Sequence, residues 1–156
     1  VYWPYCNGKN NFNMLANVPK SQKYADKNLN TKREYKYFTV AYKMSGGKKV
    51  YLGRTNTVHV AMPYAAKTNV LKVTVNKTKA NLAKGKTFKI TKKVKLENPK
   101  KKALNHLTKK ERFITSNAKV ATVSSAGVIK AVRKGTCTVY VMSENGVCAK
   151  IKVTVK

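Results

Sequence analysis

The stretch TCTVYVMSENGVCAKIKVTV, residues 136–155, decides the fold class. On both sides of Asn145-Gly146 apolar and polar residues alternate, which is the period of a half-buried β-strand. Asn-Gly between two such runs is a favoured two-residue hairpin turn. One alternate set after the turn is mostly polar, so we expect one face in water and the other against a core. The residues expected at that core are Val147, Ala149, Ile151, Val153 and Val155.

Two of the three cysteines lie in this hairpin. A two-residue turn would place Cys148 opposite position 143 and Cys137 opposite position 154. The two sulfurs would then be far beyond the Cα spacing of about 5.5–6 Å that a disulfide needs. We therefore expect both to be buried as small hydrophobic residues. An odd free cysteine would otherwise suggest a reducing or anaerobic habitat.

Short alternating runs separated by turn residues continue outward from the hairpin to the start of the chain. Turns every 8–12 residues or so are typical of β-sandwiches. Ser45-Gly46-Gly47-Lys48 predicts a hairpin loop, and residues 104–108 have room for one helical turn. Strands are expected at 1–6, 24–29, 34–42, 49–61, 71–75, 88–96, 112–115, 121–123 and 128–132. The valines expected in the core are Val120, Val123, Val128, Val132, Val139 and Val141.

The strand pattern breaks once, at the run around Pro63. We interpret residues 63–69 as a linker between residues 1–62 and residues 70–156. The sequence thus predicts an all-β chain of two small β-sandwich modules in tandem.

Residues 70–156 resemble the bacterial Ig-like group 2 (BIG2) family. The resemblance lies in SNAKVATV at 116–123, in AGVIKA at 126–131 and in KGT at 134–136, which stand in the family's order and spacing. It implies a small Greek-key sandwich on secreted or surface-attached bacterial proteins, serving adhesion or spacing other domains from the cell. It implies no catalytic residues.

Residues 1–61 resemble part of a fibronectin type III domain. Leu29, Tyr35, Tyr37 and Ala41 match that family's run into its sixth strand, with Thr39 where valine is usual. The resemblance implies that Tyr35 is a corner tyrosine whose hydroxyl bonds the nearby backbone, and that Trp3 is a core residue. It also implies two strands before Val1, so we expect the first module to be incomplete at its N-terminus, which leaves strand swapping and the oligomeric state open.

The charge balance constrains partners more than fold. Lys+Arg number 34 against Asp+Glu 5, a formal net charge of +29. Such a surface attracts polyanions and repels its own copies. Four of these cations are arginine, and lysine lacks the bidentate fork that reads phosphates and bases specifically. No apolar run approaches the roughly 18–20 residues that a bilayer span needs, so we expect no membrane insertion.

Candidate catalytic, metal and cofactor sites are absent from the pattern. The five carboxylates are scattered, although Asp26 and Glu34 straddle the predicted corner. His59, His106 and the cysteines show none of the spacings of a zinc site. We therefore expect no enzyme, no cofactor and no metal.

Clustered lysines are the candidate binding residues. One interpretation is a solvated face that aids solubility and protects strand edges. The other is attraction to an anionic cell-wall polymer or acidic glycan, with nucleic acid bound only non-specifically. The residues predicted for polyanion binding are Lys92, Lys93, Lys100, Lys101, Lys102, Lys109 and Lys110.

The sequence as a whole favours a non-catalytic, extracellular structural or adhesion module. We expect it to be secreted or attached to the wall of a Gram-positive, anaerobic bacterium. The alternative is a carbohydrate-binding or spacer accessory of a secreted glycoside hydrolase.

Overall fold

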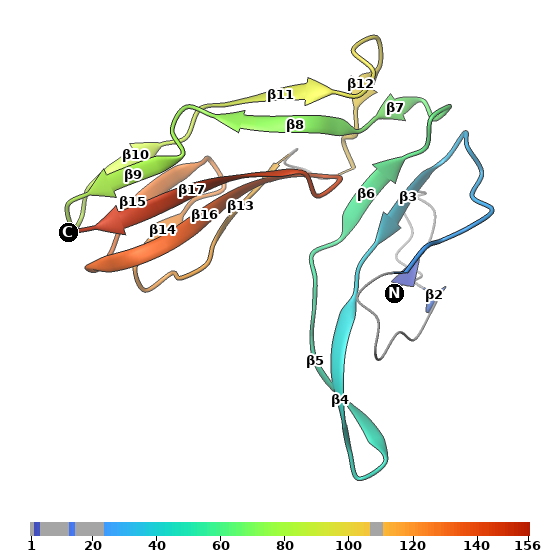
Figure 1. Ribbon diagram of the computed structural model, residues 1–156, viewed down its shortest axis with the longest axis horizontal. Coiled ribbons are helices and arrows are strands. Elements are labelled where there is room, and N and C mark those ends of the chain that lie inside the picture. Colours follow the sequence, from blue (N-terminus) through green and yellow to red (C-terminus); the bar gives the residue numbers. More distant parts are fainter. Residues whose placement is uncertain (1, 4–12, 15–23, 107–110) are drawn as a thin grey trace.

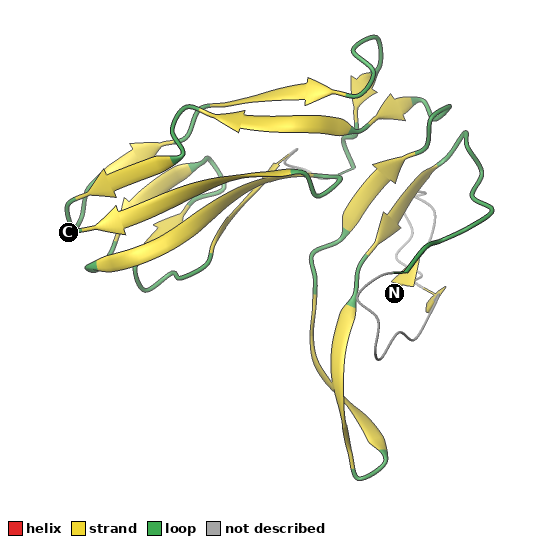
Figure 2. Ribbon diagram, in the orientation of Figure 1, coloured by secondary structure: helices red, strands yellow, loops and turns green. Residues whose placement is uncertain are grey.

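The computed structural model describes residues 2–3, 13–14, 24–106 and 111–156, and these form an all-β structure (Figure 2). The predicted fold class is confirmed: the described residues contain strands β1–β17 and no helix. A long apolar helix able to cross a bilayer is accordingly not found in this part of the chain.

The larger sheet of the C-terminal sandwich has the strand order β13-β16-β17-β9. The hairpin predicted over residues 136–155 forms its centre, with Val139 opposite Ile151 and Val141 opposite Ala149. β9 runs parallel to β17, and the other neighbours are antiparallel. The strand bounds are β9 Lys79–Leu82, β13 Glu111–Thr115, β16 Gly135–Ser143 and β17 Cys148–Val155.

The opposing layer consists of a three-stranded sheet, β10-β15-β14, and the strand pair β11-β8 (Figure 1). The long strand predicted over 88–96 is in fact two strands, because β10 pairs with β15 whereas β11 pairs with β8. The bounds are β8 Val70–Val75, β10 Thr87–Lys89, β11 Lys92–Leu96, β14 Ala121–Val123 and β15 Val128–Ala131.

The core lies between these layers and follows the predicted alternation in most strands. Ile151, Val153 and Val155 are buried and Lys150 and Lys152 are exposed, as expected for β17. The prediction for Val132 was wrong, because it is 38% exposed. In β15 the inward set is one residue out of phase with the predicted one. Ile129 and Ala131 face the core.

Gly127 shows why this corner of the sandwich needs a glycine. Its φ is +74°, and a Cβ there would lie 2.9 Å from the Phe113 ring. Any side chain would therefore meet both a left-handed backbone and an aromatic ring.

The turn of the central hairpin is one residue longer than predicted. Met142 lies opposite Cys148, and the Ser143 amide donates to the Val147 carbonyl at 2.9 Å, which leaves a three-residue loop. Gly146, at φ +87°, takes the left-handed position that such loops require. Both cysteines of the hairpin are free, as expected, but Cys148 is exposed, so the prediction of burial holds for Cys137 and not for Cys148.

The N-terminal region, residues 24–68, contains two antiparallel ribbons in succession. β3 (Glu34–Tyr37) pairs with β6 (Val58–Ala61), and β4 (Val40–Ser45) pairs with β5 (Lys48–Arg54). The chain passes from β3 into β4, turns, and returns through β5 into β6. The β4–β5 hairpin projects away from the sandwich (Figure 1). A further short pair joins β1 (Tyr2–Trp3) to β2 (Asn13–Met14).

Two expectations for this region have opposite outcomes. The strand predicted over 24–29 is not formed. The hydrogen bond predicted for Tyr35 is present: the Asn30 amide donates to the buried Tyr35 hydroxyl at 2.8 Å. Most of the predicted strand 1–6 and the side chain of Trp3 lie outside the described residues.

The predicted linker, residues 63–69, is partly buried: Ala65, Thr68 and Asn69 are buried, whereas Tyr64 is exposed. Ala65 is buried with Ala61 and Leu104. β7 (Lys67–Thr68) pairs in parallel with β12 (Lys102–Ala103). Of the helical turn predicted over 104–108, residues 104–106 are not helical and the others lie outside the described residues.

Candidate functional site

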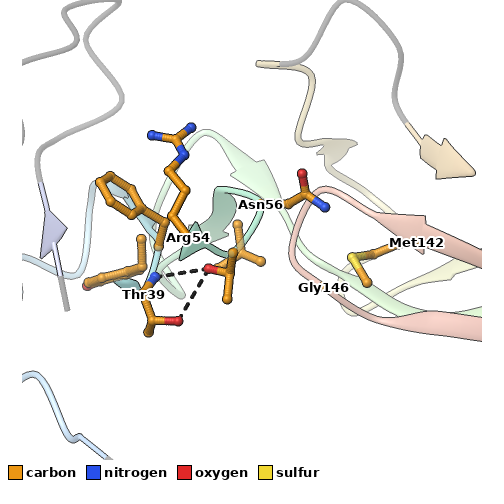
Figure 3. A pocket seen from close by; sticks show the side chains of 9 residues that line it. Thr39, Arg54, Asn56, Met142 and Gly146 are labelled. Carbon is orange, nitrogen blue, oxygen red and sulfur yellow. Dashed lines mark hydrogen bonds between the residues drawn. The ribbon is translucent and has the colours of Figure 1, made fainter. Parts of the chain in front are cut away.

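A groove lies where the root of the β4–β5 hairpin meets the turn of the β16–β17 hairpin. It is open to solvent and has a volume of about 540 Å³. Arg54 lies on one side of it, and Met142 and Gly146 lie on the other (Figure 3). Tyr37 and Phe38 also line it. The Arg54 guanidinium lies over the Phe38 ring at 4.6 Å. The groove therefore combines an apolar lining with a cation, a combination suited to an anionic ligand that has an apolar face.

The Thr39–Thr55 pair fixes the chain at the root of the hairpin. The Thr39 amide donates to the Thr55 hydroxyl at 2.9 Å (Figure 3). The Thr55 amide donates to the Thr39 carbonyl at 2.8 Å. These bonds hold the two lengths of chain together between the β3–β6 and β4–β5 ladders.

A second concentration of polar groups joins the N-terminal region to the sandwich. We call Glu34, His59, His106, Arg112 and Glu144 the junction cluster. Glu34 contacts the Nε2 atom of His106, and its carboxylate lies 4.0 Å from the Lys67 ammonium. The rings of His59 and His106 are stacked with centroids 5.0 Å apart.

Burial governs the charge state of His59, which is 6% exposed. Desolvation, together with the nearby His106, Lys36 and Arg112, lowers the pKa of His59 from 6.5 to about 4, and Glu34 opposes this effect. His59 is therefore neutral at pH 7. A stack in which one imidazole is neutral avoids repulsion between two cations.

Glu144 connects the hairpin turn to both histidines. Its carbonyl accepts from the His59 amide at 2.8 Å, and its carboxylate accepts from the His106 amide at 3.0 Å. Arg112 donates to the Thr57 carbonyl at 2.7 Å. Burial lowers the pKa of Arg112, and Glu144 counteracts that shift. A buried carboxylate that accepts such bonds is a structural element of the contact.

Two asparagine side chains complete the junction by imitating backbone pairing. The Asn69 amide group accepts from the Ala61 amide at 2.8 Å and donates to the Ala61 carbonyl at 2.9 Å. The Asn145 amide group bonds the amide and carbonyl of Val70 in the same way, at 3.2 and 2.9 Å. Each reciprocal pair fixes the orientation as well as the distance of the segments that it joins.

Five of the seven lysines predicted for polyanion binding lie in the described part of the chain. Lys92 lies with its ammonium 5.8 Å from the centre of the Phe113 ring, and Lys93, Lys100 and Lys102 are exposed. Lys101 donates to the carbonyls of Pro63 and Ala65 at 3.0 and 2.8 Å. Lys109 and Lys110 lie outside the described residues.

Asp26 and Glu97 lie in contacts outside the junction cluster. Asp26 accepts from the Tyr37 hydroxyl at 3.0 Å, so it does not join Glu34 at the predicted corner. Glu97 accepts from Asn69 at 2.9 Å. Among the residues that the structure describes, no group of three or more His, Cys, Asp or Glu is placed to hold a metal ion.

Sequence reasoning missed the junction cluster and the groove. The stacked histidines are 47 positions apart, and no local motif joins them. The sequence offered one indication, the small number of acidic residues. In a chain with only five of them, each is a candidate for a specific structural bond.

Parts of an S-layer protein of known structure align with this chain at low identity. A crystal structure of the S-layer protein SbsC aligns with 80% of this chain and 16% of its own, at 17% identity and a TM-score of 0.46. A structure of SbsC domains 4 and 5 aligns with 64% of this chain and 58% of its own, at 20% identity and a TM-score of 0.46. No curated protein matches the chain.

The model of the bacterial Ig-like domain (group 2) matches residues 69–155. This range contains both layers of the sandwich and agrees with the resemblance found in the sequence, while the fibronectin type III resemblance has no match of this kind. The chain belongs to the bacterial Ig-like domain (group 2) family.

Proposed function

We propose that the chain is a non-catalytic structural module of a bacterial surface or secreted protein, which presents a cationic surface to anionic wall polymers or acidic glycans. The supporting observation is the placement of its few acids. Glu34 and Glu144 lie in the junction cluster, Glu97 bonds the junction residue Asn69, and Asp26 bonds Tyr37. Most described lysines are exposed, so the outer surface retains the excess positive charge.

The same arrangement favours a rigid unit. Contacts of Glu34 with His106, of His59 with His106 and Glu144, and of Arg112 with Thr57 bridge the N-terminal region and the sandwich. Ala65 is buried with Ala61 and Leu104. A module with such a contact keeps a fixed orientation between its ends, which suits a spacer or a lattice element.

We further propose that residues 1–62 form a partial fibronectin type III-like module, followed by the linker 63–69 and the Ig-like sandwich 70–156. The corner bond of Tyr35 supports this assignment, because that tyrosine is 1% exposed and bonds the backbone five residues earlier.

Binding at two salt concentrations tests the proposal. The purified chain is incubated with cell wall, mucin and DNA, and the bound fraction is measured at low and at high salt. We expect recovery on wall and mucin that falls steeply with salt, because salt screens exposed charges. Recovery independent of salt would contradict the electrostatic proposal, and no recovery at either salt concentration would leave only the spacer function.

A further inference from the structure

One face of the β4–β5 hairpin combines aromatic rings with cations. The strand register places Tyr42 opposite Tyr51, Met44 opposite Lys49 and Val40 opposite Arg54. Paired residues of an antiparallel ladder lie on the same face. The register shift after Ala41 leaves Leu52 as an extra residue on β5, and this bulge keeps Arg54 on the face of Tyr51, so the three pairs form one stripe. We call it the hairpin stripe; with Phe38, which lies under Arg54, it comprises Phe38, Val40, Tyr42, Met44, Lys49, Tyr51 and Arg54.

Rings and cations are in direct contact along the stripe. The Lys49 ammonium lies 4.9 Å from the centre of the Tyr42 ring, and the Arg54 guanidinium lies 4.6 Å from that of Phe38. Arg54 also lines the groove at the root of the hairpin, so the stripe continues into that groove. The result is an elongated surface rather than an isolated pocket.

The stripe places apolar surface in water. Tyr51 is 63% exposed and Met44 58% exposed. Within the described part of the chain, β4 and β5 pair only with each other (Figure 1). Exposed apolar surface of this kind, surrounded by polar groups, is typical of an interaction site.

The charge of the hairpin favours one kind of occupant. Residues 40–54 contain Lys43, Lys48, Lys49 and Arg54 and no acidic residue. A second copy of the chain would bring the same positive charges together, which is unfavourable. The tip, Ser45-Gly46-Gly47, has no large apolar side chain to enter a bilayer. The charge instead complements a negatively charged polymer that also has apolar faces.

We propose that the hairpin stripe binds an acidic polysaccharide. The apolar faces of successive sugar rings pack on Tyr42 and Tyr51, and the carboxylates of the sugars pair with Lys49 and Arg54. The proposal rests on the proposed function, because an extracellular cationic module meets anionic glycans. The new proposal goes beyond the proposed function, because it places the binding site on the β4–β5 hairpin and not on the lysines of the sandwich.

Polygalacturonate, a linear chain of uronic acids, is the probe, with poly(dT) as the competing polyanion. The test variant is Tyr42→Ser with Tyr51→Ser, and Tyr51→Ser alone serves if the double variant does not fold. Val50→Ser is the matched control, because Val50 is paired with Lys43 on the opposite face and is 41% exposed. Lys93→Gln with Lys100→Gln tests the charge of the sandwich.

At one low salt concentration we expect the tyrosine variant to lose affinity for polygalacturonate by about tenfold. The Val50 variant should stay within about twofold, because the contact is confined to one face of the ribbon. Equal losses in the tyrosine and Val50 variants, a larger loss in the lysine variant, or tighter binding of poly(dT) than of polygalacturonate would overturn the proposal. Absence of wild-type binding to any polyanion would instead contradict the proposed function itself.

Discussion

The β16–β17 hairpin of the sandwich and the β4–β5 hairpin are both antiparallel ribbons, yet their surroundings differ. β16 and β17 lie inside a four-stranded sheet that is covered by a second layer, and Val139, Val141 and Ile151 are fully buried. β4 and β5 form a two-stranded ribbon in which Tyr51 and Leu52 are more than half exposed. Alternation creates a buried face only where another layer exists to cover it.

The two regions therefore perform different tasks. Burial of aliphatic side chains stabilises the sandwich, at about 25 cal/mol per Å² of apolar surface removed from water. The hairpin gains little of this stabilisation and keeps rings and cations available at its surface. The junction cluster lies between them and holds the hairpin in a fixed place relative to the sandwich.

The largest effect is expected from a cavity in the sandwich. Ile151→Ala removes buried methyl groups opposite Val139, and we expect it to lower the free energy of unfolding by about 2–5 kcal/mol. Ile151→Val is the matched control, with an expected loss of about 0.5–1.5 kcal/mol. Urea titration followed by circular dichroism measures both. Equal effects of the two substitutions would mean that this core tolerates cavities.

An intermediate effect is expected from pH at the junction. The pKa of His59 is about 4 in the folded protein and 6.5 in the unfolded chain. Between pH 4 and pH 6.5 the unfolded chain therefore binds more protons than the folded protein. The contribution of His59 to stability is complete above pH 6.5 and is lost as the pH falls toward 4. The loss is on the order of 1–3 kcal/mol.

His59→Gln isolates this effect, because glutamine does not titrate. Unfolding free energies of wild type and variant are measured from pH 7 to pH 4, and we expect the variant to show the smaller decline. Parallel curves for the two proteins would show that His59 does not carry the acid sensitivity.

The smallest effect is expected in the hairpin. Tyr51→Ser changes a side chain that is 63% exposed, so we expect the free energy of unfolding to change by no more than about 0.5 kcal/mol. Thermal unfolding of wild type, Tyr51→Ser and Ile151→Ala, measured side by side, checks this prediction. A loss as large as that of Ile151→Ala would show that the hairpin face is covered in solution, and the comparison between the two regions would fail.

The sequence was most informative where alternation was long. Residues 147–155 were placed with the correct face inward because five apolar positions of this run agree on one face and most positions between them are polar. Val132 was misplaced because it follows a four-residue strand, β15, in which Val128 and Ile129 are both apolar. The turn was misjudged by one residue because Asn-Gly occurs in both two- and three-residue loops.

For the hairpin stripe, the sequence could predict the kinds of side chain but not their arrangement in space. Positive charge and the abundance of tyrosine are visible in the sequence, but the exposure of Tyr51 is not, and the pairing of Tyr42 with Tyr51 depends on the irregularity after Ala41. The junction cluster brings together residues as distant as Glu34 and Glu144, and no spacing rule predicts their contacts.

By itself the sequence determined an all-β chain, its family over residues 69–155 and its excess of positive charge. These follow from local alternation, turn residues and composition, which need no knowledge of distant contacts. Only the tertiary structure decided which carboxylates lie at the junction, that residues 63–69 are partly buried, and that the hairpin face stays exposed. The physical reason is that burial and side-chain pairing depend on which distant segments approach each other.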